Sequence, residues 1–174
     1  RSYGEKFLGK TAVVAKDTPA FIGNRIGTYG IQSLFQQVIS MGLNVEDVDR
    51  LTGPVIGRPK SATFRTTDLV GLDTLVHVAN GVYDNCPHDE MRADFKIPEF
   101  VQNMLENQWL GDKTGQGFYK KTTNDKGLRE ILSLNLNTLT YSPQKKTNFP
   151  VLSKTKAIEN VIDRFPVLIS GTDQ

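Results

Sequence analysis

Residues 19–41 read PAFIGNRIGTYGIQSLFQQVISM and carry the longest helical pattern in the chain. In the second half of this stretch the large apolar side chains recur at the spacing of one helix face: Ile31, Leu34, Phe35, Val38 and Ile39. An apolar stripe of this kind packs against a hydrophobic core. This stretch therefore predicts a long amphipathic helix around which the remaining elements are arranged.

Both ends of this stretch carry boundary signals. Thr18 suits an N-cap position, and Pro19 suits the first helical turn, where a missing N–H does no harm. Gly42 suits the left-handed residue that commonly follows a helix. We therefore expect one helix from Pro19 to Met41.

Shorter patterns surround the long helix. We expect helices over residues 45–51 and about 61–70, one that carries residues 75–83, one that opens at Pro98 and closes at Gly111, and one over residues 157–169 that Pro166 bends or shortens. Residues 11–15 predict a single strand, residues 131–134 and 139–141 a β-hairpin, and residues 143–150 a linker. The expected fold class is mainly α with a small β-hairpin tail.

The composition limits the function classes. Hydrophobic residues make up 38% of 174 residues, with 15 glycines in addition, which is typical of a globular domain. Twenty-one basic and 19 acidic residues leave a net charge of +2, too small for a dedicated nucleic-acid-binding protein. No apolar run is long enough to span a membrane. Because Arg1 stands where a complete chain has methionine, we expect a segment of a longer protein.

Cysteine and histidine are scarce. Cys86 is the only cysteine, so no disulfide forms within the chain, and we expect a reducing, cytoplasmic location. With only His77 and His88 besides, the sequence offers no cluster with the spacing of a metal site. No pair of residues has the pattern of an activated nucleophile and its base.

Asn24 is the most suggestive polar residue. It lies near the start of the long helix between Phe21, Ile22 and Ile26. A carboxamide both donates and accepts, so it suits a ligand in which a hydroxyl and a carbonyl lie close together. The alternative is an asparagine that ties the helix to a neighbouring loop.

Two basic features are weaker candidates. Lys113 precedes a glycine-rich turn that allows close backbone approach to a ligand, although it lacks the strand–turn–helix context of a phosphate-binding loop. Arg58, Lys60 and Arg65 form a positive cluster that could attract a phosphorylated carrier. The alternative for both features is a solvated charged surface.

Three motifs together resemble the C-terminal domain of 3-hydroxyacyl-CoA dehydrogenases. The first is KDTPAFIGNR at residues 16–25, and the last is KTGQGFY at residues 113–119. Between them lie the residues similar to the family's Gly-x-Pro…Phe…Asp-x-Val-Gly-Leu-Asp segment: Gly57, Pro59, Phe64, Asp68, Gly71, Leu72, Asp73 and Thr74. The sequence beyond the last motif more loosely resembles the large bacterial fusions with enoyl-CoA hydratase.

The resemblance implies a helical domain of the 6-phosphogluconate dehydrogenase C-terminal type. Residues 1–16 would be the remnant of an NAD-binding Rossmann domain that carries the catalytic His–Glu pair and whose glycine-rich fingerprint this chain lacks. Residues 17–121 would form the helical substrate and dimerisation domain. Residues 122–174 would form the hairpin, the linker and the start of a following region.

The resemblance also implies roles for individual residues. Asn24 matches the asparagine that faces the substrate near its reacting C3 oxygen, and Lys113 matches the lysine that approaches NAD. We further expect four residues to contact the acyl-CoA substrate: Phe21, Arg58, Lys60 and Phe64.

The resulting hypothesis is a substrate-binding and dimerisation domain of an NAD-dependent 3-hydroxyacyl-CoA dehydrogenase of fatty acid β-oxidation, inactive without its Rossmann domain. It converts a 3-hydroxyacyl-CoA to the 3-ketoacyl-CoA only as part of the parent protein, as a homodimer. The alternatives are a helical assembly module without ligand contact, and a domain of a related hydroxy-acid dehydrogenase.

Overall fold

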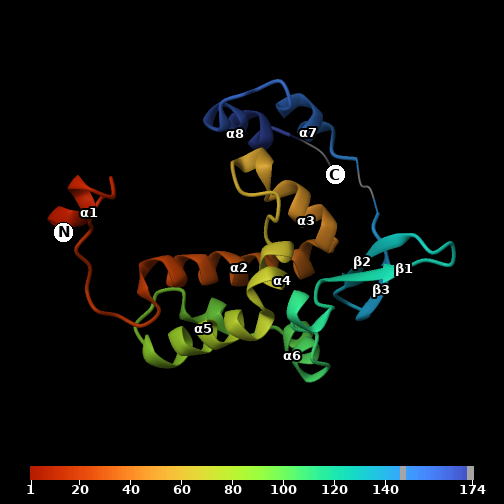
Figure 1. Ribbon diagram of the computed structural model, residues 1–174, viewed down its shortest axis with the longest axis horizontal. Helices are drawn as coiled ribbons and strands as arrows, with labels where there is room; N and C mark the ends of the chain where they lie inside the picture. The colour runs from red at the N-terminus through yellow and green to blue at the C-terminus, as the bar shows by residue number, and fades with distance from the viewer. Residues whose placement is uncertain (146–147, 172–174) are drawn as a thin grey trace.

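Helices dominate the computed structural model, which describes residues 1–145 and 148–171 (Figure 1). The α-helices are α1 (Ser2–Lys6), α2 (Phe21–Met41), α3 (Val45–Leu51), α4 (Phe64–Val70), α5 (Leu72–Asn85), α6 (Glu99–Glu106), α7 (Pro150–Thr155) and α8 (Val161–Ile169). Short 3-10 helices are η1 (Pro54–Ile56), η2 (Arg92–Phe95) and η3 (Asp112–Thr114). Strands β1 (Tyr119–Thr123), β2 (Arg129–Asn135) and β3 (Thr140–Pro143) complete the fold. The expected fold class, mainly α with a small β tail, is confirmed.

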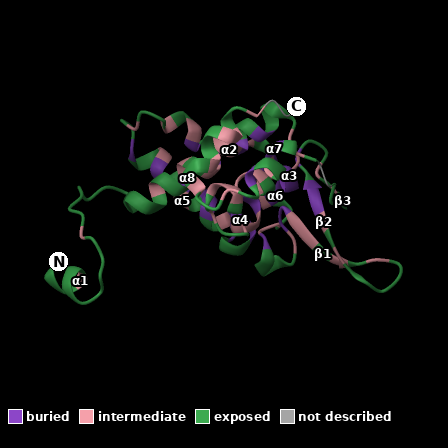
Figure 2. Cartoon of the chain, turned by 90° about the horizontal axis from the view of Figure 1, so that it is seen from above, coloured by how far each residue is buried: buried purple, intermediate pink, exposed green. Residues whose placement is uncertain are grey.

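The helices pack around the long α2. Helix α5 lies along α2, and α3, α4, α6 and the sheet gather at the C-terminal end of α2 (Figure 1). Helices α7 and α8 pack together, and α8 contacts η1. Helix α1 and the segment after it stand apart from the rest and are almost entirely exposed (Figure 2).

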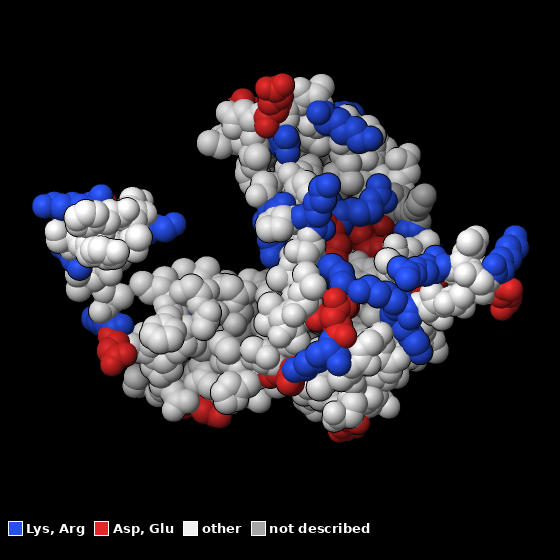
Figure 3. Space-filling view, viewed as in Figure 1, with Lys and Arg blue, Asp and Glu red and all other residues white. Residues whose placement is uncertain are grey.

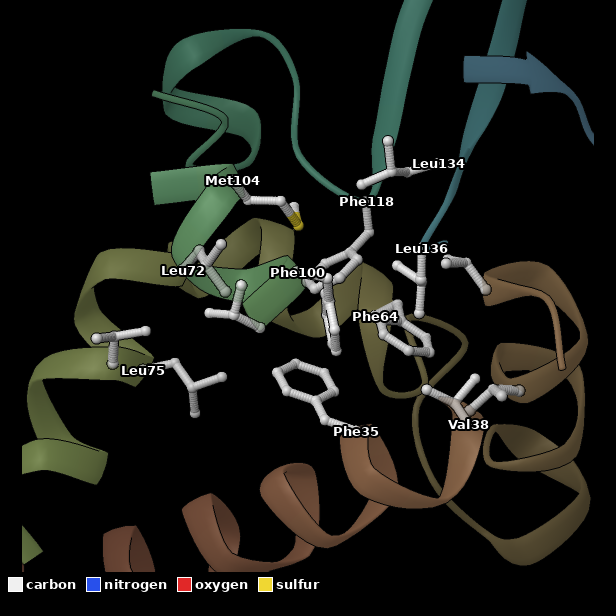
Figure 4. Close-up of a cluster of buried hydrophobic side chains, with 14 residues drawn as sticks. Phe35, Val38, Phe64, Leu72, Leu75, Phe100, Met104, Phe118, Leu134 and Leu136 are labelled. Atoms are coloured by element: carbon white, nitrogen blue, oxygen red, sulfur yellow. The ribbon is translucent and has the colours of Figure 1, made fainter. Parts of the chain in front are cut away.

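Four phenylalanines form the centre of the hydrophobic core (Figure 4). Phe35 of α2 stacks on Phe64 of α4 with ring centroids 5.5 Å apart, and Phe118 lies 4.6 Å from Phe64. Phe100 of α6 meets the edge of Phe35 at 5.5 Å. Such pairs add to the free energy gained by burying large apolar side chains. This core therefore holds the C-terminal half of α2, while the N-terminal half projects beyond it and packs through Tyr29 on a smaller buried cluster from α5 and η2.

The sheet is antiparallel, in the order β1-β2-β3. Leu134 of β2 pairs with Tyr141 of β3, and the Asn135 side chain accepts the N–H groups of Asn137 and Thr138 in the turn. This confirms the predicted hairpin. The pairing of β1 with β2 was not predicted, because the polar sequence YKKTT of β1 lacks an alternating apolar pattern.

Several helix boundaries differ from the predictions, and positive φ angles explain them. Helix α2 begins at Phe21 and not at Pro19, because Ala20 has φ 69° and no side-chain cap is formed. Helix α4 begins at Phe64 because Ala62 has φ 49°, and α6 ends at Glu106 because Gln108 has φ 58°. Non-glycine residues in this conformation interrupt a right-handed helix.

The predictions for the two ends of the chain were partly wrong. Residues 11–15 form no strand: the described structure offers them no pairing partner, and Val13 and Val14 are exposed. The predicted helix over residues 157–169 begins only at Val161, where Asn160 caps it by accepting the N–H of Ile162 at 3.0 Å. Residues 146–147 of the predicted linker lie outside the described residues.

Candidate functional site

Asn24 lies near the N-terminal end of α2, where the helix projects beyond the core. Its side chain is exposed and makes no hydrogen bond within the described residues. Phe21, Ile22 and Ile26 beside it are 78%, 53% and 66% exposed. A free carboxamide is therefore presented on an uncovered stretch of α2, where the exposed Phe21 precedes it by three residues on the same helix face. Both its donor and its acceptor remain available.

Glycines form one side of this projecting half of α2. Gly23, Gly27 and Gly30 recur at spacings of four and three residues, which places them on the same helix face. At each of them a Cβ atom would meet nothing within 4 Å. Another polypeptide backbone can therefore approach this face of α2 closely.

An ion pair fixes the orientation of the projecting half. Arg25 donates from Nε to Oδ2 of Asp89 at 2.7 Å, and its Nη2 bonds the same oxygen. Although burial acts to raise it, the pKa of Asp89 is lowered by the N–H of Met91 and by Arg25. Tyr29 also packs on Phe95 of η2, with ring centroids 6.2 Å apart. These contacts hold Asn24 pointing away from the core.

Lys113 lies in the η3 turn, close to the N-terminus of α5. Its Nζ lies 2.6 Å from Oδ2 of Asp73, in the first turn of α5. Both side chains are 46% exposed. The hydrogen bond from Lys113 lowers the pKa of Asp73. Gly71 makes room for the pair, because its φ is 99° and a Cβ there would lie 3.0 Å from Nζ of Lys113.

A buried carboxylate joins this turn to α4. Asp68 is 2% exposed and accepts the backbone N–H groups of Phe118 and Tyr119 at 2.8 and 2.9 Å. Burial raises its pKa to about 6, outweighing the two amide donors and Arg65. Gly117 and Gly111 pack closely here, since a Cβ on Gly117 would lie 2.6 Å from Cα of Gly111.

A half-buried carboxylate, Asp49 of α3, caps α4 from outside that helix. It accepts the backbone N–H groups that begin α4, from Thr63, Phe64 and Arg65, at 2.9, 2.6 and 3.0 Å. The hydroxyl of Tyr119 donates to it at 2.9 Å. Burial raises the pKa of Asp49 despite these donors. Asp49 is not identifiable from the sequence, because its partners are 14 or more residues away and no local pattern marks it.

The predicted site residues fall into separate regions. The second and third motifs come together through Asp68 and Lys113, whereas Asn24 lies 11 residues before Phe35, about 16 Å along α2. The chain by itself therefore does not bring Asn24 and Lys113 into one site.

The other expected substrate contacts have different surroundings. Phe64 is fully buried in the core, so the expectation that it contacts substrate is wrong for this conformation. Arg58 turns inward, donating to Oγ1 of Thr63 at 3.0 Å and to the carbonyl of Ala62 at 3.3 Å. Lys60 is exposed and, with Arg65, lines a groove between α3 and α7.

Residues 1–145 and 148–171 contain neither a metal-binding cluster nor a membrane-spanning helix. No group of three or more histidine, cysteine, aspartate or glutamate side chains there has the geometry to hold a metal ion. None of the helices in those ranges combines the length and apolar character that crossing a membrane requires.

Comparison with known proteins agrees with the motif pattern. The sequence profile described as "3-hydroxyacyl-CoA dehydrogenase, C-terminal domain" matches residues 21–121. A probable 3-hydroxyacyl-CoA dehydrogenase of Bacillus subtilis is 48% identical over 173 residues, which are 99% of this chain and 21% of that protein. A protein of the same description from Deinococcus radiodurans is 50% identical over 124 residues, 71% of this chain and 35% of that protein. The chain thus spans about a fifth to a third of these relatives.

More distant relatives and a solved structure extend the comparison. A putative fatty acid oxidation complex trifunctional enzyme of Rickettsia prowazekii is 27% identical over 164 residues, 92% of this chain and 22% of that protein. The crystal structure of M. tuberculosis FadB2 matches with a TM-score of 0.58 and 30% identity, covering 70% of this chain and 41% of that one. Because the profile covers more than half of the chain and all three motifs agree with it, this chain belongs to the family of 3-hydroxyacyl-CoA dehydrogenase C-terminal domains.

Proposed function

We propose that this chain is the substrate-facing and dimer-forming domain of an NAD-dependent 3-hydroxyacyl-CoA dehydrogenase that acts in cytoplasmic fatty acid β-oxidation. The observation that carries the proposal is the exposed carboxamide of Asn24 in an uncovered apolar surface, on a helix fixed by Arg25 and Asp89. Such a surface suits the wall of a cleft whose other wall is a separate domain. The family membership supplies the reaction, oxidation of a 3-hydroxyacyl-CoA to the 3-ketoacyl-CoA.

Asn24 would hold the reacting end of the substrate. Its carboxamide can donate to the oxygen on C3 and accept from a hydroxyl, so it suits both the alcohol and the ketone. The exposed ring of Phe21 would help to exclude water once the Rossmann domain covers it, which would strengthen a polar contact at this position. The proton of the alcohol would go to a base on the Rossmann domain.

Lys113 would contact the cofactor side of the cleft. NAD, when bound by the Rossmann domain, would supply the hydride acceptor for oxidation at C3. The half-exposed ammonium of Lys113 suits a phosphate, a ribose or a carboxamide. Before the domains close, Asp73 holds this ammonium in place. Closure of the Rossmann domain over α2 would bring NAD towards Lys113 and the substrate towards Asn24.

The proposed division of the chain follows from these roles. Residues 1–16 would be the end of the Rossmann domain, residues 17–121 the helical domain, and residues 122–174 the hairpin, the linker and the start of a further region. The profile match to residues 21–121 supports the middle assignment.

The glycine face of α2 would form the homodimer contact, since Gly23 and Gly27 leave room for a second backbone. Sedimentation velocity tests this assignment. Gly27→Leu should turn a dimer into a monomer, whereas Gly81→Leu, at an equally open helical glycine of α5, should leave the dimer intact. A dimer that survives Gly27→Leu would contradict the contact.

Turnover of the full-length parent tests the role of Asn24. Asn24→Ala should lower kcat/KM by roughly tenfold to a thousandfold, because the lost contact strengthens in the transition state. The melting temperature should not change, since the side chain of Asn24 forms no hydrogen bond within the described residues. Asn80→Ala, at an exposed asparagine of α5, serves as the control.

Two results would contradict this proposal. Unchanged turnover by Asn24→Ala would leave the chain a helical assembly module without ligand contact. A parent enzyme that oxidises the free hydroxy acid as efficiently as its CoA thioester would be a related hydroxy-acid dehydrogenase instead. The isolated chain should give no sustained NADH absorbance with NAD and 3-hydroxybutyryl-CoA.

A further inference from the structure

A groove of about 880 Å³ lies between α3, the face of the sheet and α7. We call it the lysine groove, after Lys60, Lys121, Lys145 and Lys156, which line it. Figure 3 shows lysine and arginine side chains around a hollow in which carboxylates are visible. Its volume lies within the range of small-molecule sites. It is separate from the exposed face of α2 that carries Asn24.

Two of the three carboxylates that line the groove already have partners. Asp49 accepts from three backbone N–H groups and from the hydroxyl of Tyr119. Asp112 accepts a bidentate pair of hydrogen bonds from the guanidinium of Arg65, at 2.7 and 2.6 Å. The charge of Asp112 is thus already balanced by Arg65, and the oxygens of Asp49 are occupied by donors other than the lysines.

Most of the lysines lack such partners. Within residues 1–145 and 148–171, the ammonium groups of Lys60, Lys145 and Lys156 form no ion pair. Lys121 lies 3.8 Å from the already paired Asp112. The groove thus retains positive charge that suits an anion.

The third carboxylate provides an acceptor. Glu46 is 8% exposed; its Oε1 accepts the N–H of Lys145 at 2.8 Å, while the buried Oε2 has no hydrogen-bond partner. A buried acceptor without a donor is costly, so this oxygen suits a hydroxyl or an amine of a ligand. Val55, Ile131 and Leu152 give the same groove apolar walls.

We propose that the lysine groove binds a nucleoside diphosphate. The two phosphates would contact the lysines at the rim of the groove. A hydroxyl of the ribose or an amino group of the base would donate to Glu46, and the base would lie against Val55, Ile131 and Leu152. ADP, coenzyme A and NAD share this chemistry. The proposal does not depend on the dehydrogenase function, because it concerns a different surface and is tested by binding alone.

Isothermal titration calorimetry of ADP into the 174-residue chain at low salt tests the proposal. We expect saturable 1:1 binding that Lys60→Ala combined with Lys156→Ala weakens about tenfold or more. Lys126→Ala, at the exposed tip of the β1–β2 hairpin, is the matched control and should leave the affinity unchanged. Circular dichroism of each variant checks that the fold is retained.

The carboxylate gives the sharper test. Glu46→Gln keeps the acceptor for the N–H of Lys145, but it should weaken ADP binding while leaving inorganic pyrophosphate binding unchanged or stronger, because one negative charge is removed. Titrations with coenzyme A and NAD identify which carrier of this group binds best. Absence of saturable ADP binding, or pyrophosphate binding as tight as that of ADP, would overturn the proposal.

Discussion

The carboxylate of Asp68 accepts the backbone N–H of Phe118 at 2.8 Å, joining two residues that are 50 positions apart in the chain. Phe118 then packs its ring against both Phe64 and Phe35 in the core. One buried acceptor therefore aligns the strand that follows the η3 turn with the helices that carry the core. The same turn holds Lys113, so this bond also positions the residue proposed to approach NAD.

Asp68→Asn should lower the free energy of unfolding at pH 7 by about 1–2 kcal/mol, because an amide replaces one acceptor with a donor that faces an N–H. Urea unfolding followed by circular dichroism measures the change. Asp125→Asn, in the exposed β1–β2 turn, should have no effect. Equal midpoints for both variants would mean that the two bonds to Phe118 and Tyr119 contribute little.

The pKa of Asp68 gives the stability a specific pH dependence. Its pKa is about 6 in the folded chain against 3.8 in an unfolded one, so the folded state binds the proton more tightly. The resulting stabilisation is present below about pH 4 and is lost as the pH rises through 6. The gap in unfolding free energy between the wild type and Asp68→Asn should therefore widen by about 2–3 kcal/mol from pH 7 to pH 4. A gap independent of pH would contradict this.

Gly117→Ala should destabilise the chain by roughly 3 kcal/mol or more, because the new methyl group would lie 2.6 Å from the backbone of Gly111 and even closer to Asp68. Thermal unfolding measures the loss. Gly81→Ala is the matched control: a Cβ there meets nothing, so the helix α5 should gain up to about 1 kcal/mol. Similar effects at the two sites would refute the close packing of the turn.

Phe64→Ala should cost about 3–5 kcal/mol, since it empties the centre of the aromatic cluster. Phe21→Ala should change stability by less than about 0.5 kcal/mol, because that ring is 78% exposed. In the full-length parent, Phe21→Ala should raise KM more than Phe64→Ala does, the reverse of their effects on stability. A stable Phe64→Ala variant with a raised KM would show that Phe64 contacts the substrate after all, although its ring is buried here.

Local sequence patterns determined most of the helices and the hairpin. The apolar periodicity of residues 31–39 and the glycine at position 42 correctly predicted the body and the end of α2, because such signals act within one or two turns. The motifs at residues 57–74 and 113–119 were sufficient to indicate the family. The sequence also marked Asn24 and Lys113 as candidates for polar contacts, and these roles remain proposals.

Only the tertiary structure decided which of these residues are available to a ligand. It buried Phe64, turned Arg58 inward, left Asn24 exposed, and joined Asp49 and Asp68 to backbone N–H groups 14 to 51 residues away. Burial and long-range hydrogen bonds depend on how distant segments pack, and no local pattern encodes that packing. The lysine groove arises in the same way, because its walls come from α3, the sheet and α7, which meet only in the folded chain.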